Sequence, residues 1–204
     1  MNHYLTEKNL YQAFRSALEE SAQINTESWT YIKPFLNLRH FKKGEFIIKE
    51  GEVENYLSAV ASGCVRHFIM KGDDEVSFEF AFENELSNSY ASFLSRQPSR
   101  IFIEAIEAVS LVSLHYDNLQ ELYKGSAIGE RIGRLTTEGY YMWREQRELM
   151  LLTLTPEELY LDLLSQYPEY INRIPQKYLA TYLQVKPESL SRIKRRIHTN
   201  RKRT

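Results

Sequence analysis

Several kinds of chemistry have no residues to support them in this 204-residue sequence. Cys64 is the only cysteine, which excludes an internal disulfide and a cluster held by several thiolates. The five histidines are scattered and include no His-x-His pair, so no group of metal ligands can be recognised. The sequence also lacks a Gly-x-Ser-x-Gly nucleophile motif and a glycine-rich phosphate loop. We therefore expect no enzyme activity, no metal site and no resident cofactor.

Long apolar runs are missing as well. No stretch approaches the ~20 residues of a membrane-spanning helix, and the first residues lack the basic and apolar regions of a signal peptide. A hydrophobic content of 43% and a charged content of 26% are ordinary for a globular protein with a real core. We expect a cytoplasmic protein that has no membrane partner.

The sequence patterns change twice along the chain. Residues 1–36 predict two helices, because Thr6 and Thr26 can each cap a helix with apolar residues at helical spacing. From about 38 to 120, short segments rich in β-branched and aromatic residues are separated by glycine turns, which predicts a small all-β barrel or roll. Residues 84–98 interrupt these strands and are expected to hold a short helix, whose N-terminal N–H groups could face a ligand.

Residues 126–150 return to a helical pattern, in which successive positions four and three apart form a heptad seam. One interpretation is a helix that packs against its own β-domain. We favour the other interpretation, a homodimer seam. Its members would be Ile128, Ile132, Leu135, Met142 and Leu149.

The next segment begins with a capping box. Thr155 is a good cap, Pro156 suits the first helical position, and Glu158 follows three residues after the cap. The flexible join before this helix should lie near residues 150–156.

Residues 174–204 predict two short helices joined by a turn. Leu179 and Leu183 mark the first helix, and Leu190, Ile193 and Ile197 repeat at helical spacing in the second. A short helix, a turn and a second helix with polar leading residues form the pattern of a helix-turn-helix, whose second helix enters the DNA major groove.

Charge is divided unevenly between this segment and the rest. Residues 173–204 contain ten Lys and Arg residues against one acid and carry a net charge of +9, whereas residues 1–172 carry −10. Lys and Arg side chains that displace counterions from phosphates supply most sequence-independent DNA affinity. Residues 199–204 alone are equally consistent with a solvated tail.

The order of a β-roll, a long helix and a helix-turn-helix resembles the Crp/Fnr family of bacterial transcription regulators. In the roll, the resemblance depends on Lys43-Gly44-Glu45, Glu50-Gly51-Glu52 and Ser62-Gly63-Cys64-Val65-Arg66, and in the head on LATYLQVKPESLSRIKRRI. The segments LTLTPEEL and KYLATYL resemble the branch of the family that is common in Bacteroidetes.

The resemblance implies an α+β protein with a cyclic-nucleotide-binding-like β-roll, a double-stranded β-helix with flanking helices. Residues 1–125 would form the N-terminal helices and this sensor domain, residues 126–150 the dimerisation helix, and residues 151–204 a winged helix-turn-helix that binds DNA.

The resemblance also implies roles for residues in the DNA-binding segment. Glu188, Ser191 and Arg192 would read base edges, since arginine suits guanine and glutamate can accept from cytosine. Two departures alter these expectations: Pro187 replaces a residue that is commonly arginine, and Gln184 stands where a turn glycine is usual. The phosphate contacts would be Gln176, Lys177, Lys186, Arg195 and Arg196.

The effector pocket departs further from the family pattern. Cyclic-nucleotide sensors carry a Gly-Glu pair for the ribose and an Arg followed by Ser or Thr for the phosphate. Here the corresponding stretches are Asn84-Glu85-Leu86 and Ser99-Arg100-Ile101. Without the hydroxyl beside the arginine, a cyclic phosphate loses part of its charge-assisted hydrogen bonding, so we expect no cAMP binding. An unknown small molecule could still bind there.

Together these features predict an effector-responsive, homodimeric, sequence-specific DNA-binding regulator, with RNA polymerase as a possible further partner. The alternative is a small-molecule-binding module of cyclic-nucleotide-binding type whose basic end binds nucleic acid without sequence preference.

Overall fold

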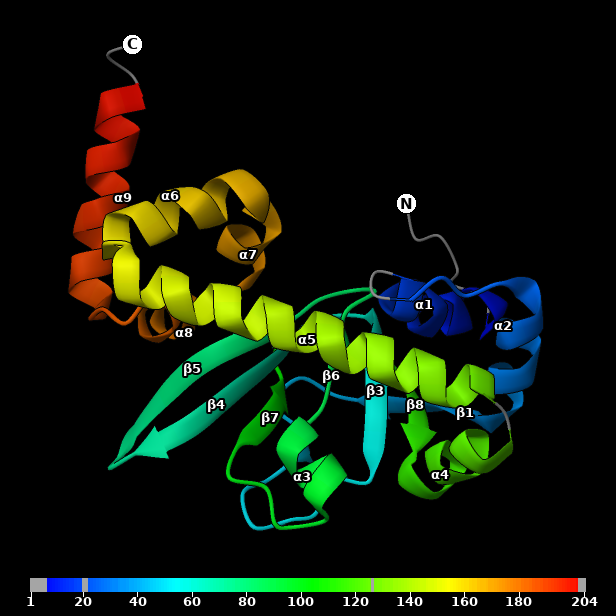
Figure 1. Cartoon of the computed structure of the whole chain (residues 1–204). Coiled ribbons are helices and arrows are strands. Elements are labelled where there is room, and N and C mark those ends of the chain that lie inside the picture. The colour runs from blue at the N-terminus through cyan, green and yellow to red at the C-terminus, as the bar shows by residue number, and fades with distance from the viewer. Residues whose placement is uncertain (1–6, 20–21, 126, 202–204) are drawn as a thin grey trace. The chain divides into compact units, whose positions relative to one another are not determined.

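The computed structural model describes residues 7–19, 22–125 and 127–201, which form helices and two β-sheets (Figure 1). The chain divides into two compact units. The first unit comprises Met1–His67 and Phe80–Trp143, and the second comprises Phe68–Glu79 and Arg144–Thr204. No helix within the described ranges is long and apolar enough to cross a membrane.

The strands confirm the predicted roll. They form two four-stranded sheets with the orders β1-β8-β3-β6 and β2-β7-β4-β5. In the first sheet, β8 lies antiparallel to both neighbours, so that Val112 is opposite Leu38 on one side and Ala59 on the other. The strands are β1 (Leu36–Phe41), β2 (Phe46–Ile48), β3 (Tyr56–Ser62), β4 (Val65–Lys71), β5 (Asp74–Ala81), β6 (Leu86–Ser87), β7 (Phe102–Ala105) and β8 (Val109–His115).

The roll has a well-packed apolar core. Val60, Val65, Ile103 and Leu111 are completely buried in it. Arg66 is also completely buried, and its Nη1 lies 3.3 Å from Glu104 Oε2. A buried arginine needs such a carboxylate, because an unpaired charge costs several kcal/mol in the interior.

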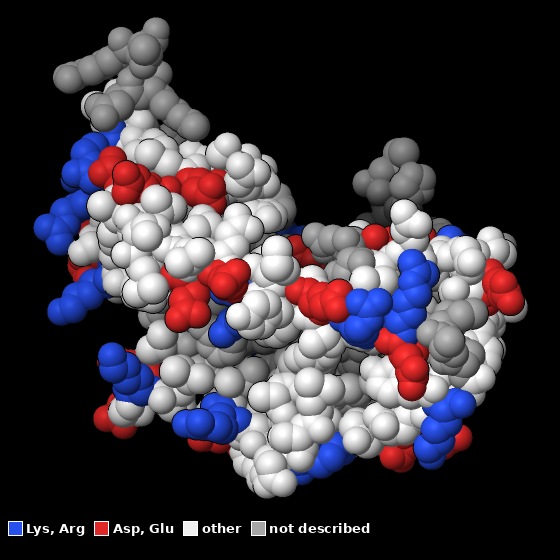
Figure 2. Space-filling view, viewed as in Figure 1, with Lys and Arg blue, Asp and Glu red and all other residues white. Residues whose placement is uncertain are grey.

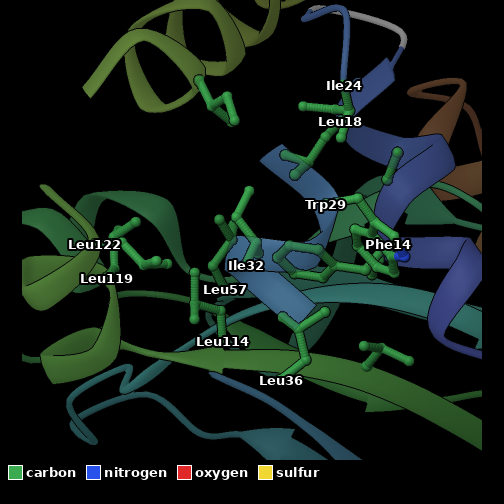
Figure 3. Packing of buried hydrophobic residues seen from close by; sticks show 14 of the residues in the cluster. Phe14, Leu18, Ile24, Trp29, Ile32, Leu36, Leu57, Leu114, Leu119 and Leu122 are labelled. Carbon is green, nitrogen blue, oxygen red and sulfur yellow. The ribbon is translucent and has the colours of Figure 1, made fainter. Parts of the chain in front are cut away.

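Helices cover the sheet that contains β1, β3 and β8. A second apolar cluster joins these strands to the helices, with Phe14, Trp29 and Ile32 packed near Leu57 and Leu114 (Figure 3). The helical elements of this unit are α1 (Glu7–Glu19), α2 (Thr26–Ile32), η1 (Lys33–Phe35), α3 (Tyr90–Ser95), α4 (Tyr116–Gly125) and the first part of α5 (Ala127–Thr153).

Of the two helix starts predicted in residues 1–36, one can be compared with the structure. Thr6 lies outside the described residues. The second helix is capped one residue earlier than predicted, because Asn25 Oδ1 accepts a hydrogen bond from Ser28 N at 2.8 Å. Asparagine is as good a cap as threonine or better, and Thr26 becomes the first residue of α2.

The second unit is helical in its C-terminal part and contains α6 (Pro156–Gln166), α7 (Pro168–Arg173), α8 (Gln176–Tyr182) and α9 (Pro187–Arg201). The predicted capping box is confirmed, since Thr155 and Glu158 bond reciprocally at the start of α6. The predicted β wing is not found within residues 144–201, where no strand occurs. Between α6 and α8 the chain forms α7, which begins at Pro168.

Residues 68–79, from the β4–β5 hairpin, belong to this second unit. Ser77 N donates a hydrogen bond to Thr181 Oγ1 of α8 at 3.1 Å. Arg144 Nη1 lies 3.9 Å from Glu79 Oε2.

We predict that Gly63→Ala destabilises the roll more than Gly44→Ala does. Both glycines have positive φ, +91° and +84°, so both substitutions strain the backbone. A Cβ on Gly63 would also overlap Ala108 O and lie 2.9 Å from Val109 Cγ2, whereas a Cβ on Gly44 meets nothing within 4 Å. We expect a loss of about 1 kcal/mol for Gly44→Ala and about 3 kcal/mol for Gly63→Ala, measured by urea unfolding. Equal losses would show that the close approach at Gly63 does not matter.

Candidate nucleic-acid interface and effector cradle

The basic head contains a close crossing of two helices. Ala180 of α8 and Leu190 of α9 have no exposed surface, and Leu179 and Leu183 are buried beside them. The small side chain of Ala180 allows the two backbones to approach. The turn contains Gln184 at a φ of 57°, which is the left-handed conformation expected where related turns carry glycine.

The two sides of α9 differ sharply. Leu190, Ile193 and Ile197 are buried, whereas Glu188, Arg192, Arg195 and Arg196 are exposed. Burial of the apolar stripe fixes the rotation of the helix, so the exposed side chains point away from the head. Figure 2 shows Lys and Arg side chains along the edge of the head where α9 lies.

The predicted base-reading residues differ in their freedom. Glu188 and Arg192 are exposed, and Arg192 has only a long contact of 3.4 Å from Nη2 to Ser189 Oγ. Ser191 is engaged: its hydroxyl donates to Pro187 O at 3.0 Å and accepts from Gln176 Nε2 at 2.5 Å. A hydroxyl has one hydrogen, so Ser191 could offer a base only an acceptor.

The five predicted phosphate contacts also fall into two groups. Lys177, Lys186 and Arg195 are exposed. Gln176 instead ties α8 to α9 through Ser191. Arg196 forms an ion pair with Glu157 of α6, in which Arg196 Nε is 3.1 Å from Glu157 Oε1.

A cleft of about 540 Å³ lies beside α9. It lies at the start of α6, where the helix dipole favours an anion, but Pro156 has no N–H group and Glu158 N is bonded to Thr155 Oγ1. Two arginines of α9 also line it, and one of them, Arg196, is paired with Glu157. The lining residues are Thr155, Pro156, Glu157, Val185, Ser189, Arg192, Ile193 and Arg196.

The predicted dimer seam needs correction at its N-terminal end. Ile132 is only 7% exposed and belongs to the core of its own unit, where Leu135 packs against the same cluster. The side chain of Ile128 lies outside the described residues. Met142 and Leu149 are 66% and 55% exposed, so they remain available to a partner.

Three exposed apolar residues of α5 were not part of the predicted seam. Tyr141 is 65% exposed, Trp143 38% and Leu152 76%. Tyr141 and Leu152 are eleven residues apart, about three helical turns, and therefore lie along the same line of the helix. A seam in the C-terminal half of α5 would contain them beside Met142 and Leu149.

The predicted effector residues do not form a single charged site. Asn84 is exposed at a φ of 72°, and Glu85 Oε2 accepts a hydrogen bond from Phe82 N at 2.8 Å. Leu86 is half-buried in β6. Ser99 is buried, with its hydroxyl 2.9 Å from Ser89 Oγ and 2.9 Å from Ile101 O, whereas Arg100 is exposed.

Sequence reasoning missed two residues, Glu54 and Arg96, that organise the region around α3. Glu54 is 3% exposed and accepts hydrogen bonds from Tyr56 N at 2.9 Å and Ser89 N at 3.3 Å. Arg96 donates to Glu54 O at 2.6 Å and also bonds Asn55 Oδ1. No motif links these residues, because Glu54 and Arg96 are 42 positions apart in the chain.

Burial dominates the electrostatics of this region. It raises the pKa of Glu54, although the N–H groups of Tyr56 and Ser89 and the nearby Arg39 act in the opposite direction. Burial also lowers the pKa of Arg39, whose guanidinium lies 4.1 Å from the centre of the Tyr56 ring. Within the described residues, no group of three or more His, Cys, Asp or Glu side chains could hold a metal ion.

Comparison with known proteins gives one family and a set of similar folds. Residues 38–126 match the cyclic nucleotide-binding domain family. FixK2 from Bradyrhizobium japonicum is 20% identical, with a TM-score of 0.65 over 81% of this chain and 85% of that chain. The c-di-GMP responsive global regulator CLP from Xanthomonas campestris is 16% identical, with a TM-score of 0.63 over 86% and 93%.

The catabolite activator protein of Thermus thermophilus is 19% identical, with a TM-score of 0.56 over 90% of this chain and 87% of that chain. No curated protein matches the chain. At these identities the similarity establishes the fold, and the match to the Bacteroidetes branch stays a prediction.

We predict that Glu157→Gln strengthens binding to duplex DNA. The substitution releases Arg196 from its ion pair and leaves the cleft with one more free cation. We expect affinity to rise about threefold to tenfold at low salt, and the salt dependence to steepen by about one ion, in a fluorescence anisotropy titration.

Asp162→Asn is the matched control, because it removes the same charge from α6 at a residue that does not line the cleft. If both variants bound DNA equally well, the gain would come from net charge alone and not from Arg196.

Proposed function

This chain has a domain of the cyclic nucleotide-binding family and the fold of Crp/Fnr-type regulators, and from that premise we propose that it is a homodimeric, sequence-specific DNA-binding transcriptional regulator. Its partners would be duplex DNA, a second copy of the chain and RNA polymerase, in the cytoplasm. It would act by binding and not by catalysis.

The observation that carries this proposal is the exposed polar side of α9. Its apolar stripe is buried in the head, so Glu188, Arg192 and Arg195 project from a helix of 15 residues held in one orientation. An α-helix fits the major groove, where arginine can bond guanine O6 and N7 and glutamate can accept from cytosine N4. We assign base reading to Arg192 and Glu188.

Phosphate binding would come from the remaining exposed cations. Lys177 at the start of α8 and Lys186 in the turn precede the proposed base-reading residues in the sequence, and Arg195 follows them. Such contacts fix the position of a protein on the duplex without reading sequence. A basic head attached to an acidic remainder would leave the sensor part repelled by DNA.

The exposed apolar residues of α5 support the dimer. Met142, Leu149 and Leu152 are all more than half exposed, and a second α5 could bury them in a helical pair. Two heads held together in this way could read half-sites one helical turn apart.

We propose that the effector is not a cyclic nucleotide. The N–H groups of Tyr56 and Ser89 in the β6–α3 region are already bonded to the carboxylate of Glu54, and a phosphate would meet that buried acid. Arg100 is exposed and is followed by Ile101, which has no hydroxyl. The response to c-di-GMP named for CLP is a property of that protein.

The alternative is a ligand-binding module with non-specific nucleic-acid affinity. Genomic fragments offered to the protein at increasing salt, in the presence of competitor DNA, separate the two functions. A preferred fragment that survives competition supports the regulator, since specific sites typically bind 10³ to 10⁷ times more tightly. Equal loss of every fragment would support the alternative.

We predict that Arg192→Ala and Lys177→Ala weaken DNA binding in different ways. Loss of Arg192 should relax the preference at one base pair and cost about 1–3 kcal/mol on the preferred site. Loss of Lys177 should weaken all fragments alike and reduce the salt slope by about one. Competition binding with single-base variants of the preferred fragment measures both effects. Identical losses on every fragment would refute base reading by Arg192.

We also predict that Leu149→Glu converts the dimer to a monomer. A charge at the centre of an apolar seam would face its own copy across the two-fold axis. Sedimentation velocity should show the dimer dissociating at concentrations at least tenfold higher than for the unmodified chain. Leu161→Glu, at a 40% exposed leucine of α6, is the control and should leave the dimer intact. A dimer that tolerates Leu149→Glu would place the seam elsewhere.

A further inference from the structure

A small apolar cavity lies in the first unit, beside the N-terminal half of α5. It measures about 40 Å³ and is lined by residues from α1, α2, β3, β8, α3, α4 and α5. None of the five predicted effector residues lines it. Figure 3 shows Leu119 and Leu122 of α4 pointing toward Ile32 and Leu57, which are also among the lining residues.

One polar group of the cavity is unusual. Thr136 is 7% exposed, and its Oγ1 is buried with no hydrogen-bond partner among the described residues. Other threonines of α5 bond back to the carbonyl four residues earlier, as Thr137 does to Gly133 O at 2.8 Å and Thr153 to Leu149 O at 2.7 Å. A buried hydroxyl without a partner is unfavourable, and a ligand in the cavity would supply one.

The lining also limits the charge of an occupant. No Asp, Glu, Lys, Arg or His side chain borders the cavity, so an ion would be desolvated without compensation. Burial raises the pKa of the lining residue Tyr123, which keeps its hydroxyl neutral. An occupant must therefore be uncharged.

The volume limits the size. One water molecule needs roughly 10–15 Å³ of such space, so a volume of about 40 Å³ accommodates on the order of two or three non-hydrogen atoms. Two glycines of α5 allow it to lie in close contact with α4. A Cβ on Gly129 would overlap Leu122 O, and a Cβ on Gly133 would overlap the Tyr123 hydroxyl. α5 already lies against α4 at these glycines and cannot move closer to fill the space.

We propose that this cavity binds an uncharged, largely apolar molecule of about two or three non-hydrogen atoms, such as a short alcohol, with its one polar group bonded to Thr136. Gly129, Ile132, Gly133 and Thr136 all belong to α5, the helix that also carries the exposed Met142 and Leu149. Occupancy would therefore act on the proposed dimer helix. This regulatory role rests on the proposed function, whereas the binding itself does not.

Xenon, ethanol and formate are the probes that test the cavity. Xenon enters dry apolar cavities, ethanol adds one hydroxyl, and formate is a charged molecule with as many non-hydrogen atoms as ethanol. Each is titrated into the full chain while the ¹³C-methyl NMR signals of Leu114, Leu122 and Ile132 are followed. We expect saturable shifts of these methyl signals with xenon and ethanol and none with formate. The proposal would be overturned if the methyl shifts did not saturate and were spread over the whole protein. It would also be overturned if a water molecule filled the cavity and neither xenon nor ethanol displaced it.

Thr136→Val tests the hydroxyl, because valine keeps the shape of threonine. The variant should bind xenon as before and bind ethanol about twofold to tenfold more weakly, as the loss of one neutral hydrogen bond predicts. Thr153→Val makes the same change at an exposed position of α5 and should alter neither affinity. Unchanged ethanol binding in Thr136→Val would refute the assigned role of Thr136.

The outcome is independent of DNA binding. If the probes bind and no DNA fragment is preferred, the proposed regulatory function is wrong, whereas the proposal that the cavity binds a small molecule is supported. If a fragment is preferred and the probes do not bind, the cavity proposal fails alone. Ethanol at a concentration near its dissociation constant for the unmodified chain fills more of the cavity there than in Thr136→Val. It should therefore change the dimer dissociation constant of the unmodified chain more than that of Thr136→Val, and an equal effect on both would remove the regulatory role.

Discussion

The helix α5 is constrained at one end and free along one side at the other. Near its start, Gly129 and Gly133 bring it into direct contact with α4, and Ile132 is buried in the core of the same unit. Toward its end, Met142 and Leu149 are exposed. The two glycines thus fix how closely the N-terminal part of α5 approaches α4 within the first unit.

The head uses neutral contacts to hold its shape and leaves most of its cations outside. Ala180 and Leu190 pack without exposed surface, and Gln176 joins α8 to α9 through Ser191. None of these contacts changes with salt, so the orientation of α9 should persist when surface charges are screened. The exception is Arg196, which Glu157 neutralises. If α9 binds DNA as proposed, this acid would lower non-specific affinity for phosphates.

Local signals in the sequence predicted most of the local structure that depends on a few neighbouring residues, and they failed where distant residues decide. The capping box at Thr155 was predicted correctly, whereas the cap expected at Thr26 is Asn25, one residue earlier. Ile132 was misplaced, since a heptad pattern shows that one side of a helix is apolar and not which partner buries it. Arg96 and Glu54 were missed for a related reason: their contact joins positions 42 residues apart. The roles of the exposed α9 residues in reading DNA stay predictions.

Negative charge that is already present limits which molecules could serve as the proposed effector. Next to α3, Glu54 occupies the N–H groups of Tyr56 and Ser89, and an anion that entered would add Coulombic repulsion to the burial that already raises the pKa of Glu54. The cavity beside α5 has no charged lining and one unpartnered hydroxyl, that of Thr136. An anion is unfavourable in both places, for opposite reasons: the first already contains a carboxylate, and the second contains no cation. A neutral molecule meets neither obstacle. In the cavity beside α5, its binding would also remove the cost of a buried hydroxyl without a partner.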